Sequence, residues 1–562
     1  MRNGILPLIT LVILSFPAST RSQVTQNWAR GYAAFLPSNA KMAMDGSGNI
    51  YVAGNISNGF SLIKYNSAGT GQWSTTAAAE TNGLVGIGTD NAGNVYAVSN
   101  TGPAIAVTAF GPSGTQLWTT NLQVDNDGMR NAIANVMTVD ASGNVYVGGQ
   151  ITVGVSTGHT AYMTVKVSSG VQKYVGIYEG TAIGYKQFAS INAIACDNAG
   201  NVYVSGTAYN AHEYLFRAIG AILIRRDSSF DMTTIKYDSS GHTVWTNNYN
   251  GGYDVGDYGF AVTVDPSSGN VYALGQSTVN GLVGDVVAYS SGGSQLWIYQ
   301  NSSFPNDDAI AVDPSGNIIT GGTNKFNISK YSSSGSLTWS YSNPGIILSG
   351  NQYGGNLSMA LDKNGNTYIT SPANNFTEYY TAEISSGGSF VWSTTYGAGG
   401  SGGSSAIAIY TPVSRFGLIT YPQINVAGTA GNNTNFTTLQ YSYRPVLVLA
   451  AQDSSTALDN SSATTPDNRL SNFESNLSNF PNPFRGNTSI NYTLANDSHV
   501  TLQVFDQSGK PVATVFEGDQ TAGPHYQPFN ADRLAAGVYF YRIIANSGQQ
   551  NFTQAKTMAI LP

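Results

Sequence analysis

TVDASGNVYVGG, residues 138–149, carries the pattern that decides the fold of this chain. Small apolar residues lead to an aspartate, two or three variable residues follow, and Gly-Asn then opens a short apolar run. The pattern occurs seven times, with its aspartate at Asp45, Asp90, Asp140, Asp197, Asp265, Asp313 and Asp362. A weaker eighth copy reads AIAIY at 406–410 and INVAGTA at 424–430. Such a repeat is typical of one supersecondary unit that is stacked many times.

Each repeat carries four segments with the alternation and β-branched content of strands. The first is small and apolar, the second follows Gly-Asn, and the third ends in a pair such as Lys64-Tyr65. The fourth holds a bulky aromatic residue: Trp73, Trp118, Trp245, Trp297, Trp339 and Trp392, with Tyr174 in one copy. Small residues fit strands near an axis and bulky ones fit strands at a rim, as in a β-propeller. An open solenoid explains this size gradient poorly.

The ends of the repeat region predict how a ring closes. A fourth-type strand with Trp28 precedes the first repeat at 26–32, and no tryptophan strand follows the last third-type strand at 439–442. We expect Trp28 to complete an eighth blade, because a closed ring removes exposed sheet edges. The segment 443–450 is a competing closing strand. The prediction is an all-β chain with an eight-bladed propeller of four-stranded repeats over 23–449, and the weak eighth copy leaves seven blades as the alternative.

We interpret Asp-x-x-Gly-Asn as a hairpin turn. The aspartate accepts hydrogen bonds from its own backbone, and the glycine takes the left-handed position that closes the loop. Calcium binding is the rival interpretation, but the motif lacks the further carboxylates and the bidentate glutamate of a calcium loop. We therefore expect no metal and no cofactor, with calcium as the alternative.

Bulk composition narrows the class of protein. Charged residues make up 10% of the chain and its net charge is −7, so the basic stripe of a nucleic-acid-binding protein is missing. Cys196 is the single cysteine, which excludes an intrachain disulfide and favours a buried, inert thiol. Residues 1–22 have the charge, apolar stretch and small residues of a signal peptide, and we expect no transmembrane anchor after them.

The composition changes in the tail. Residues 450–475 are rich in Ser, Asn and Asp without an apolar period, which predicts a flexible linker. The alternation in INYTL, VTLQVF, VATVF and VYFYRI then predicts a small Ig-like antiparallel β-sandwich over 476–562. The turn from Asp506 to Gly509 is a hairpin signal within it.

Two known families resemble parts of this sequence. The repeated D-x-x-G-N-x-Y-V-x-G phrase, with its Lys-Tyr pair and tryptophan strand, is similar to the SBBP type of β-propeller repeat over about 26–442, which implies a fold more than an activity. The end of the chain resembles the C-terminal sorting domain of type IX secretion cargo. The matching residues are Pro481, Asn482, Pro483, Phe484, Gly509, Gly523, Gly537 and Tyr539. The resemblance implies recognition by the secretion machinery and a location outside the cell or on the outer-membrane surface; an adhesive Ig-like module is the alternative.

Candidate ligand-binding residues lie in the longer segments that cross between strands, because binding chemistry gathers on loops of a rigid scaffold. They are Asp125, Asp127, Arg130, Tyr185, Lys186, Tyr253, Asp254, Asp257, Tyr258, Asp307 and Asp308. Several precede a first strand, so we expect them near the axial mouth, where acids and tyrosines suit a cation or a carbohydrate. The alternative is that they are ordinary loop residues.

One crossing segment, 209–232, is longer than its counterparts and contains His212, Tyr214, Phe216, Arg225 and Arg226. It predicts a short helix or hairpin over the mouth, acting either as a recognition lid or as a packing insert.

The metal-binding HExxH motif and the P-loop are missing from the sequence. The leading hypothesis is a non-enzymatic surface protein that binds a glycan or another surface protein. A secreted carbohydrate-active enzyme, either a glycoside hydrolase or a lyase with acids at the mouth, is the alternative. A purely structural surface-layer component is a third possibility.

Overall fold

The computed structural model describes residues 21–560, with gaps at 34–39, 80–82, 103, 125–130, 154–158, 182–187, 219–220, 252–255, 279–282, 302–306, 323–325, 344–347, 349–356, 375, 398–402, 412–421, 431–434, 447–476, 481–483, 485, 495, 507–509, 533 and 548–550. The predicted signal peptide lies outside the described residues apart from Arg21 and Ser22, and the predicted linker lies wholly outside them. The chain divides into two compact units, Met1–Ala451 and Gln452–Pro562.

In the first unit the described residues form eight four-stranded antiparallel sheets, which we number as blades 1 to 8. Blade 1 is β2 (Lys41–Met44), β3 (Ile50–Ile56), β4 (Gly59–Tyr65) and β5 (Gly71–Ala78). Blade 2 is β6 (Leu84–Thr89), β7 (Val95–Asn100), β8 (Ile105–Phe110) and β9 (Gln116–Asn121). Blade 3 is β10 (Ala132–Val139), β11 (Val145–Val153), β12 (His159–Ser168) and β13 (Val171–Tyr178). Blade 4 is β14 (Ala189–Cys196), β15 (Val202–Ala218), β16 (Ala221–Tyr237) and β17 (Thr243–Tyr249).

The second half of this unit repeats the pattern until the last sheet. Blade 5 is β18 (Asp257–Val264), β19 (Val271–Ser277), β20 (Val283–Tyr289) and β21 (Gln295–Asn301). Blade 6 is β22 (Asp307–Val312), β23 (Ile318–Gly322), β24 (Asn327–Tyr331) and β25 (Leu337–Ser342). Blade 7 is β26 (Ser358–Leu361), β27 (Thr367–Ala373), β28 (Glu378–Ile384) and β29 (Phe390–Gly397). Blade 8 joins β30 (Gly403–Tyr410), β31 (Gln423–Ala430) and β32 (Asn435–Val446) to β1 (Arg21–Ala33) from the other end of the repeat region.

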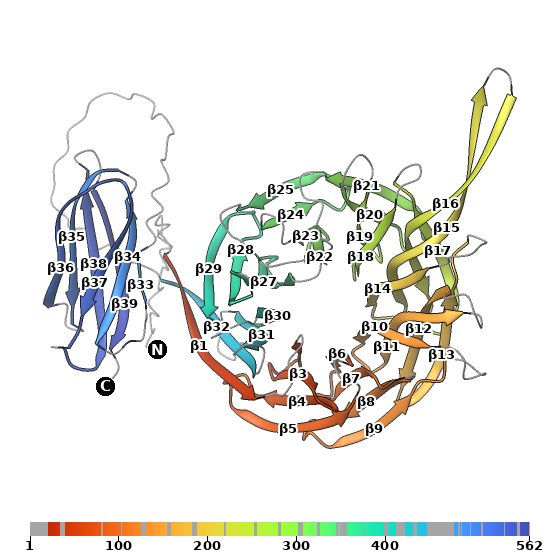
Figure 1. The fold of residues 1–562 in the computed structure, drawn as a ribbon, viewed down its shortest axis with the longest axis horizontal. Helices are drawn as coiled ribbons and strands as arrows, with labels where there is room; N and C mark the ends of the chain where they lie inside the picture. The colour runs from red at the N-terminus through yellow and green to blue at the C-terminus, as the bar shows by residue number, and fades with distance from the viewer. Residues whose placement is uncertain are drawn as a thin grey trace, which may run out of the picture. The chain divides into compact units, whose positions relative to one another are not determined.

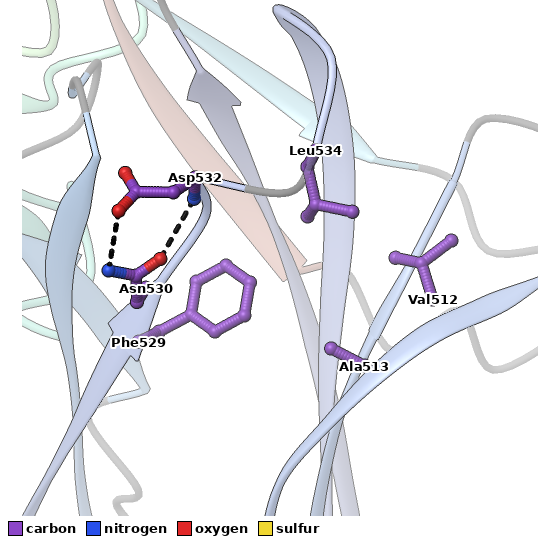
Figure 2. A pocket seen from close by; sticks show the side chains of 6 residues that line it. All are labelled: Val512, Ala513, Phe529, Asn530, Asp532 and Leu534. Carbon is purple, nitrogen blue, oxygen red and sulfur yellow. Dashed lines mark hydrogen bonds between the residues drawn. The ribbon is translucent and has the colours of Figure 1, made fainter.

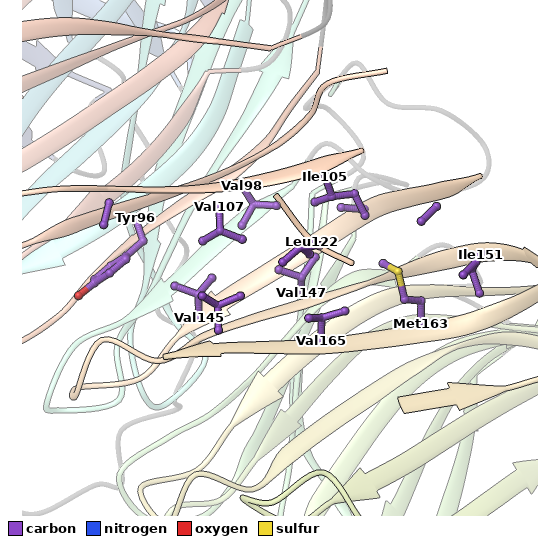
Figure 3. Packing of buried hydrophobic residues seen from close by; sticks show 14 of the residues in the cluster. Tyr96, Val98, Ile105, Val107, Leu122, Val145, Val147, Ile151, Met163 and Val165 are labelled. Carbon is purple, nitrogen blue, oxygen red and sulfur yellow. The ribbon is translucent and has the colours of Figure 1, made fainter. Parts of the chain in front are cut away.

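The blades surround a common axis (Figure 1). The first strand of each blade contacts the first strand of the next, from β2 through to β30, and β30 contacts β2. The unit is therefore a closed β-propeller, and the sequence prediction of an all-β propeller is confirmed. Apolar cores lie between neighbouring blades. Figure 3 shows the core between blades 2 and 3, where Val98 and Val107 face Val147 and Val165.

The repeated Asp-x-x-Gly-Asn motif forms the turn between the first two strands of a blade. Asp45 Oδ1 accepts the backbone N–H groups of Ser47 at 2.9 Å and Asn49 at 3.0 Å. Gly48 has a φ of 77° and donates its N–H to the Asp45 carbonyl. The turn interpretation is confirmed, and the same bonds recur at Asp90, Asp140, Asp197, Asp313 and Asp362. Protein donors thus already occupy these carboxylates.

The outer tryptophan of one blade rests on a glycine of the next. Trp73 Nε1 donates to the Pro112 carbonyl at 2.8 Å, and Lys64 Nζ donates to the same oxygen at 3.2 Å. A Cβ atom on Gly114, which has a φ of 85°, would lie 2.7 Å from the Trp73 indole. Glycine is needed there for both conformation and space. The same contact joins Trp118 to Gly170, Tyr174 to Gly241, Trp245 to Gly293, Trp297 to Gly335 and Trp339 to Gly388.

The ring closes through β1. This strand pairs antiparallel with β32 along its length, and Trp28 lies opposite Gln440. The buried Trp28 indole rests on Gly69 of blade 1, and Arg30 Nε donates to the Gly69 carbonyl at 2.9 Å. The expectation that Trp28 supplies the closing strand is confirmed. Residues 443–446 of the competing segment instead extend β32, and 447–450 lie outside the described residues.

The long insert is a hairpin. β15 and β16 remain paired beyond the blade as far as Ala218 and Ala221. In Figure 1 the hairpin projects away from the ring and does not cross its centre. The expectation of a lid over the mouth is therefore wrong, because continuous backbone pairing extends the two strands of blade 4 outward.

The second unit is a two-sheet β-sandwich. One sheet is β33 (Ser478–Phe480), β34 (Asn487–Leu494) and β37 (Gly523–Asn530). The other is β36 (Pro511–Gln520), β35 (Ser498–Phe505), β38 (Gly537–Asn546) and β39 (Asn551–Ile560). Tyr492 and Phe529 of the first sheet share an apolar core with Leu502 and Ile543 of the second. The described part of the chain contains no helix that could span a membrane.

Replacement of Trp28 by alanine should destabilise the propeller, because it removes the side chain that joins blade 8 to blade 1. We expect a loss of about 3 to 5 kcal/mol, as for other buried tryptophans. The measurement is the denaturant midpoint of the propeller transition. Leu296→Ala, at an outer-strand position that is 48% exposed, is the control and should cost little. Equal losses in the two variants would contradict the closing role of Trp28.

Candidate binding surface on blades 4 and 5

Most of the predicted ligand-binding residues fall where the structure describes no side chain. Asp125, Asp127, Arg130, Tyr185, Lys186, Tyr253 and Asp254 lie outside the described residues. Asp308 lies in β22, but its side chain is not described. Asp257, Tyr258 and Asp307 remain, and they begin the innermost strands of blades 5 and 6.

Asp257 and Asp307 do not line an open mouth. Their side chains are 1% and 5% exposed. Asp307 accepts hydrogen bonds from the Thr320 hydroxyl at 2.6 Å and from the Asn327 amide at 2.5 Å. We expected these carboxylates near the axial mouth, but both side chains are buried, since Gly251 before β18 binds Asp257 and strands β23 and β24 of the same blade bind Asp307. Their ligand-binding role stays a prediction.

Blade 5 contains two buried carboxyl groups close together. Asp257 accepts the Gly251 N–H at 2.8 Å. Asp285 accepts hydrogen bonds from the hydroxyls of Ser277 and Tyr249 and from the Gln300 amide. Burial raises the pKa of Asp257 to about 7, and the nearby Asp285 carboxylate adds to this shift. Burial also raises the pKa of Asp285.

A serine, a histidine and an aspartate meet at the root of the long hairpin. His212 Nε2 lies 3.0 Å from Asp231 Oδ1 and 3.1 Å from Ser229 Oγ, and Ser229 also donates to Asp231 at 2.9 Å. A hydrolytic triad needs the aspartate and the serine on opposite ring nitrogens. Here both contact the same nitrogen, so these three residues lack the relay geometry. No cluster of three or more His, Cys, Asp or Glu residues able to hold a metal ion occurs in the described parts of the chain.

Four aromatic side chains form a continuous group, which we call the aromatic platform. It lies on the face of the propeller that carries the loops between the second and third strands of a blade and the loops from one blade to the next; we call this the crossing-loop face. The platform consists of Phe188 before β14, Tyr209 in β15, Phe230 in β16 and Tyr258 in β18. The Phe230 ring is the centre, with ring centroids 6.2 Å from Phe188, 5.2 Å from Tyr209 and 6.3 Å from Tyr258.

The platform combines exposed carbon surface with fixed polar groups. Phe188 is 43% exposed, and the Tyr209 hydroxyl accepts a hydrogen bond from Ser228 at 3.1 Å. Asn210, next to Tyr209, is fully buried, where it accepts a hydrogen bond from the Tyr178 hydroxyl at 2.8 Å and donates one to Thr233 at 3.0 Å, so it fixes the strand beneath the platform. Aromatic faces beside an ordered hydroxyl group suit a ligand with one apolar and one polar side.

Sequence reasoning found part of this platform. Tyr258 was a predicted site residue, and Tyr209 and Phe230 lie within the long insert that the repeat comparison singled out. No sequence pattern pointed to Phe188, apart from its place shortly after the predicted pair Tyr185-Lys186. The contact between blades 4 and 5 could not be read from residues so far apart in the sequence.

Four predicted sorting residues are described. Phe484 is buried in the sandwich core and forms a parallel bridge with Ile560 of β39. Gly523 begins β37, Gly537 begins β38, and the Tyr539 hydroxyl donates to the Ala535 carbonyl at 2.9 Å. Pro481, Asn482, Pro483 and Gly509 lie outside the described residues. The sequence resemblance thus falls on a folded, self-contained domain.

Residues 478–556 match the family of secretion system C-terminal sorting domains. This sorting domain indicates that the protein is secreted or placed on the cell surface, and it implies contact with the type IX secretion machinery. The match covers the two-sheet sandwich and not the propeller.

The chain is similar to several solved structures at low identity. The Dos1 propeller has a TM-score of 0.42 and 9% identity, over 74% of this chain and 94% of that one. A streptogramin B lyase has a TM-score of 0.37 and 12% identity, over 64% and 93%. A gluconolactonase from Xanthomonas campestris has a TM-score of 0.27 and 12% identity, over 54% and 86%. These likenesses carry no argument about activity. No curated protein matches the chain.

The buried acids of blade 5 should make propeller stability fall as pH rises. The folded pKa of Asp257 is about 7, so near pH 5 to 6 the folded state holds a proton that the unfolded chain has lost. The contribution of protonated Asp257 to the free energy of unfolding is full below pH about 4 and is lost as the pH rises through 7. Asp257→Asn should flatten the fall of melting temperature over this range. Glu383, whose burial raises its pKa to about 7, should leave a residual slope.

Asp238→Asn is the matched control for this experiment. A backbone hydrogen bond from His242 lowers the pKa of the exposed Asp238. Ionisation of Asp238 therefore changes the stability of the propeller only at more acidic pH. A slope between pH 4 and 7 that is the same in Asp257→Asn and the wild type would contradict the prediction.

Proposed function

We propose that this protein is exported by type IX secretion and acts outside the cell as a non-enzymatic binding protein whose propeller carries glycan ligands on the aromatic platform. The single observation behind the binding role is the platform of Phe188, Tyr209, Phe230 and Tyr258 on the face that bears the crossing loops. We assign the propeller repeats to the SBBP type, and the C-terminal sandwich to the Ig-like class, on the motif and alternation of their sequences.

Several features support a glycan as the ligand. Sugar rings present C–H faces that pack on aromatic rings and hydroxyls that pair with amide and hydroxyl groups. Phe188 offers the exposed ring, while Tyr209 and Tyr258 flank Phe230 beneath it. Tyr209, Phe230 and Tyr258 lie on strands of two adjoining blades and Phe188 directly precedes β14, so little ordering is needed when a ligand binds.

A carbohydrate-active enzyme is the second candidate, favoured by one observation. Asp257 has a pKa of about 7 and lies near Asp285, and general acids of glycosidases have raised pKa values of this kind. Against it, the Asp257 side chain is 1% exposed, so a substrate does not reach it without rearrangement of the blade. The binding role therefore has the stronger support.

Removal of residues 476–562 should stop export, because the sorting domain is the part that the secretion machinery recognises. The expected result is loss of the protein from the medium and cell surface with accumulation inside the cell envelope, measured by immunoblot of cell fractions. Deletion of the predicted linker 450–475 alone is the control and should leave export intact. A tail-deleted protein that still reached the outside would refute the export proposal.

Phe188→Ala should weaken glycan binding about tenfold, the effect of losing about 1.4 kcal/mol of stacking contact. A glycan array identifies the ligand and calorimetry measures its affinity. Phe390→Ala is the control, because Phe390 is a similarly exposed ring, 39% accessible, on the outer strand of blade 7. Equal binding by both variants would rule out the platform. A blank array would favour a structural surface-layer role, and glycan turnover that Asp257→Asn abolishes would favour the enzyme.

A further inference from the structure

The sandwich of the sorting domain is closed along one side and open along the other. β33 and β39 are edge strands of the two sheets, and the buried Phe484 bridges from the segment after β33 to Ile560 of β39. The other two edge strands are β36 and β37. Between them lies a cavity of about 540 Å³, seen in Figure 2.

The cavity has an apolar floor and a polar rim. Val512 and Ala513 of β36, Phe529 of β37 and Leu534 line its apolar part. Asn530 and Asp532 form the rim, where the Asn530 amide donates to the Asp532 carboxylate at 3.0 Å and the Asp532 N–H donates back at 2.9 Å. Figure 2 shows this pair beside the Phe529 ring. The rim is therefore held in place before any partner arrives.

The two edge strands differ in what their backbones can offer. β37 contains Pro524 and Pro528, which have no N–H, and proline in an edge strand discourages further pairing. β36 has proline only at its first position, Pro511, and the following five residues are apolar except for Thr514. Two register shifts interrupt its pairing with β35, opposite Leu502–Gln503 and Val504–Phe505. Within the described residues β36 pairs with β35 alone. After Pro511, therefore, no proline prevents the backbone of β36 from pairing with an added strand.

We propose that the free edge of β36 and the adjoining cavity are the docking site for an extended segment of the secretion machinery. That segment pairs its backbone with β36 and places an apolar side chain among Val512, Phe529 and Leu534. The occupant is extended because only an extended backbone can pair with the open edge of β36. It carries an apolar side chain because the cavity lining is apolar. The identity of the partner rests on the proposed export function, because the family match assigns this domain to secretion.

The test is export of the full-length protein in the bacterium that makes it. Ala513→Trp fills the cavity from β36 and should lower the exported fraction at least tenfold, with the protein retained inside the cell envelope. Ala555→Trp is the matched control, because it adds the same side chain at an exposed position of β39, the opposite edge strand. The control should be exported like the wild type. Asp532→Trp, from an exposed rim position, should also block export without altering the core.

Thermal melting of each purified variant separates docking from folding. Ala513→Trp and Asp532→Trp should keep the wild-type transition of the sorting domain; if Ala513→Trp unfolds it, Asp532→Trp alone decides the test. Wild-type export of the folded tryptophan variants would overturn the docking site, while arrest of the protein lacking 476–562 would leave the export proposal standing. Normal export combined with loss of a wild-type dimer would assign the cavity to a second copy of this chain and also overturn the proposal.

Discussion

The contact between an outer tryptophan and a glycine of the following blade is the interaction on which the propeller depends. A blade is a four-stranded sheet with two apolar faces, and it buries them only against its neighbours. The aromatic ring covers the outer end of the interface. The indole N–H of Trp73, Trp245, Trp297 and Trp339 also donates to a backbone carbonyl of the next blade. Because each blade needs the next, the first and last must also meet, and Trp28 on Gly69 makes that contact.

Blade 7 departs from this scheme, and its departure follows from the same constraint. Blade 8 takes its outer strand, β1, from the other end of the repeat region. No turn therefore joins its third and fourth strands, and the tryptophan of blade 7 has no such turn to contact. Trp392 of blade 7 accordingly donates to Glu383 of its own blade at 2.5 Å. Glu383 stands before Ile384 where Lys330 stands before Tyr331, so the change from lysine to glutamate supplies an acceptor that the missing turn cannot.

The propeller and the sorting domain present different kinds of surface. Among the described acids of the propeller, Asp45 and its counterparts hold turns, and Asp257 and Asp307 lie buried within their blades. The recognition surface that we propose for the propeller is aromatic and uses side chains from neighbouring blades. The sorting domain instead exposes backbone, along an edge strand whose outer side has no partner among the described residues. Each surface thus depends on a rigid scaffold that the repeats or the sandwich provide.

The sequence by itself determined the repeat, the turn at each aspartate, the tryptophan strand, the closing role of Trp28 and the sorting domain, because each depends on local pattern or on a motif of fixed spacing. Only the tertiary structure decided which residues are accessible. Loop composition indicated acids at the mouth, but Asp257 and Asp307 are buried and hydrogen-bonded, Asp257 to the Gly251 backbone and Asp307 to Thr320 of a neighbouring strand. Phe188 and Tyr258 became neighbours of Phe230 because blades 4 and 5 pack together, and packing between blades leaves no local pattern in the sequence.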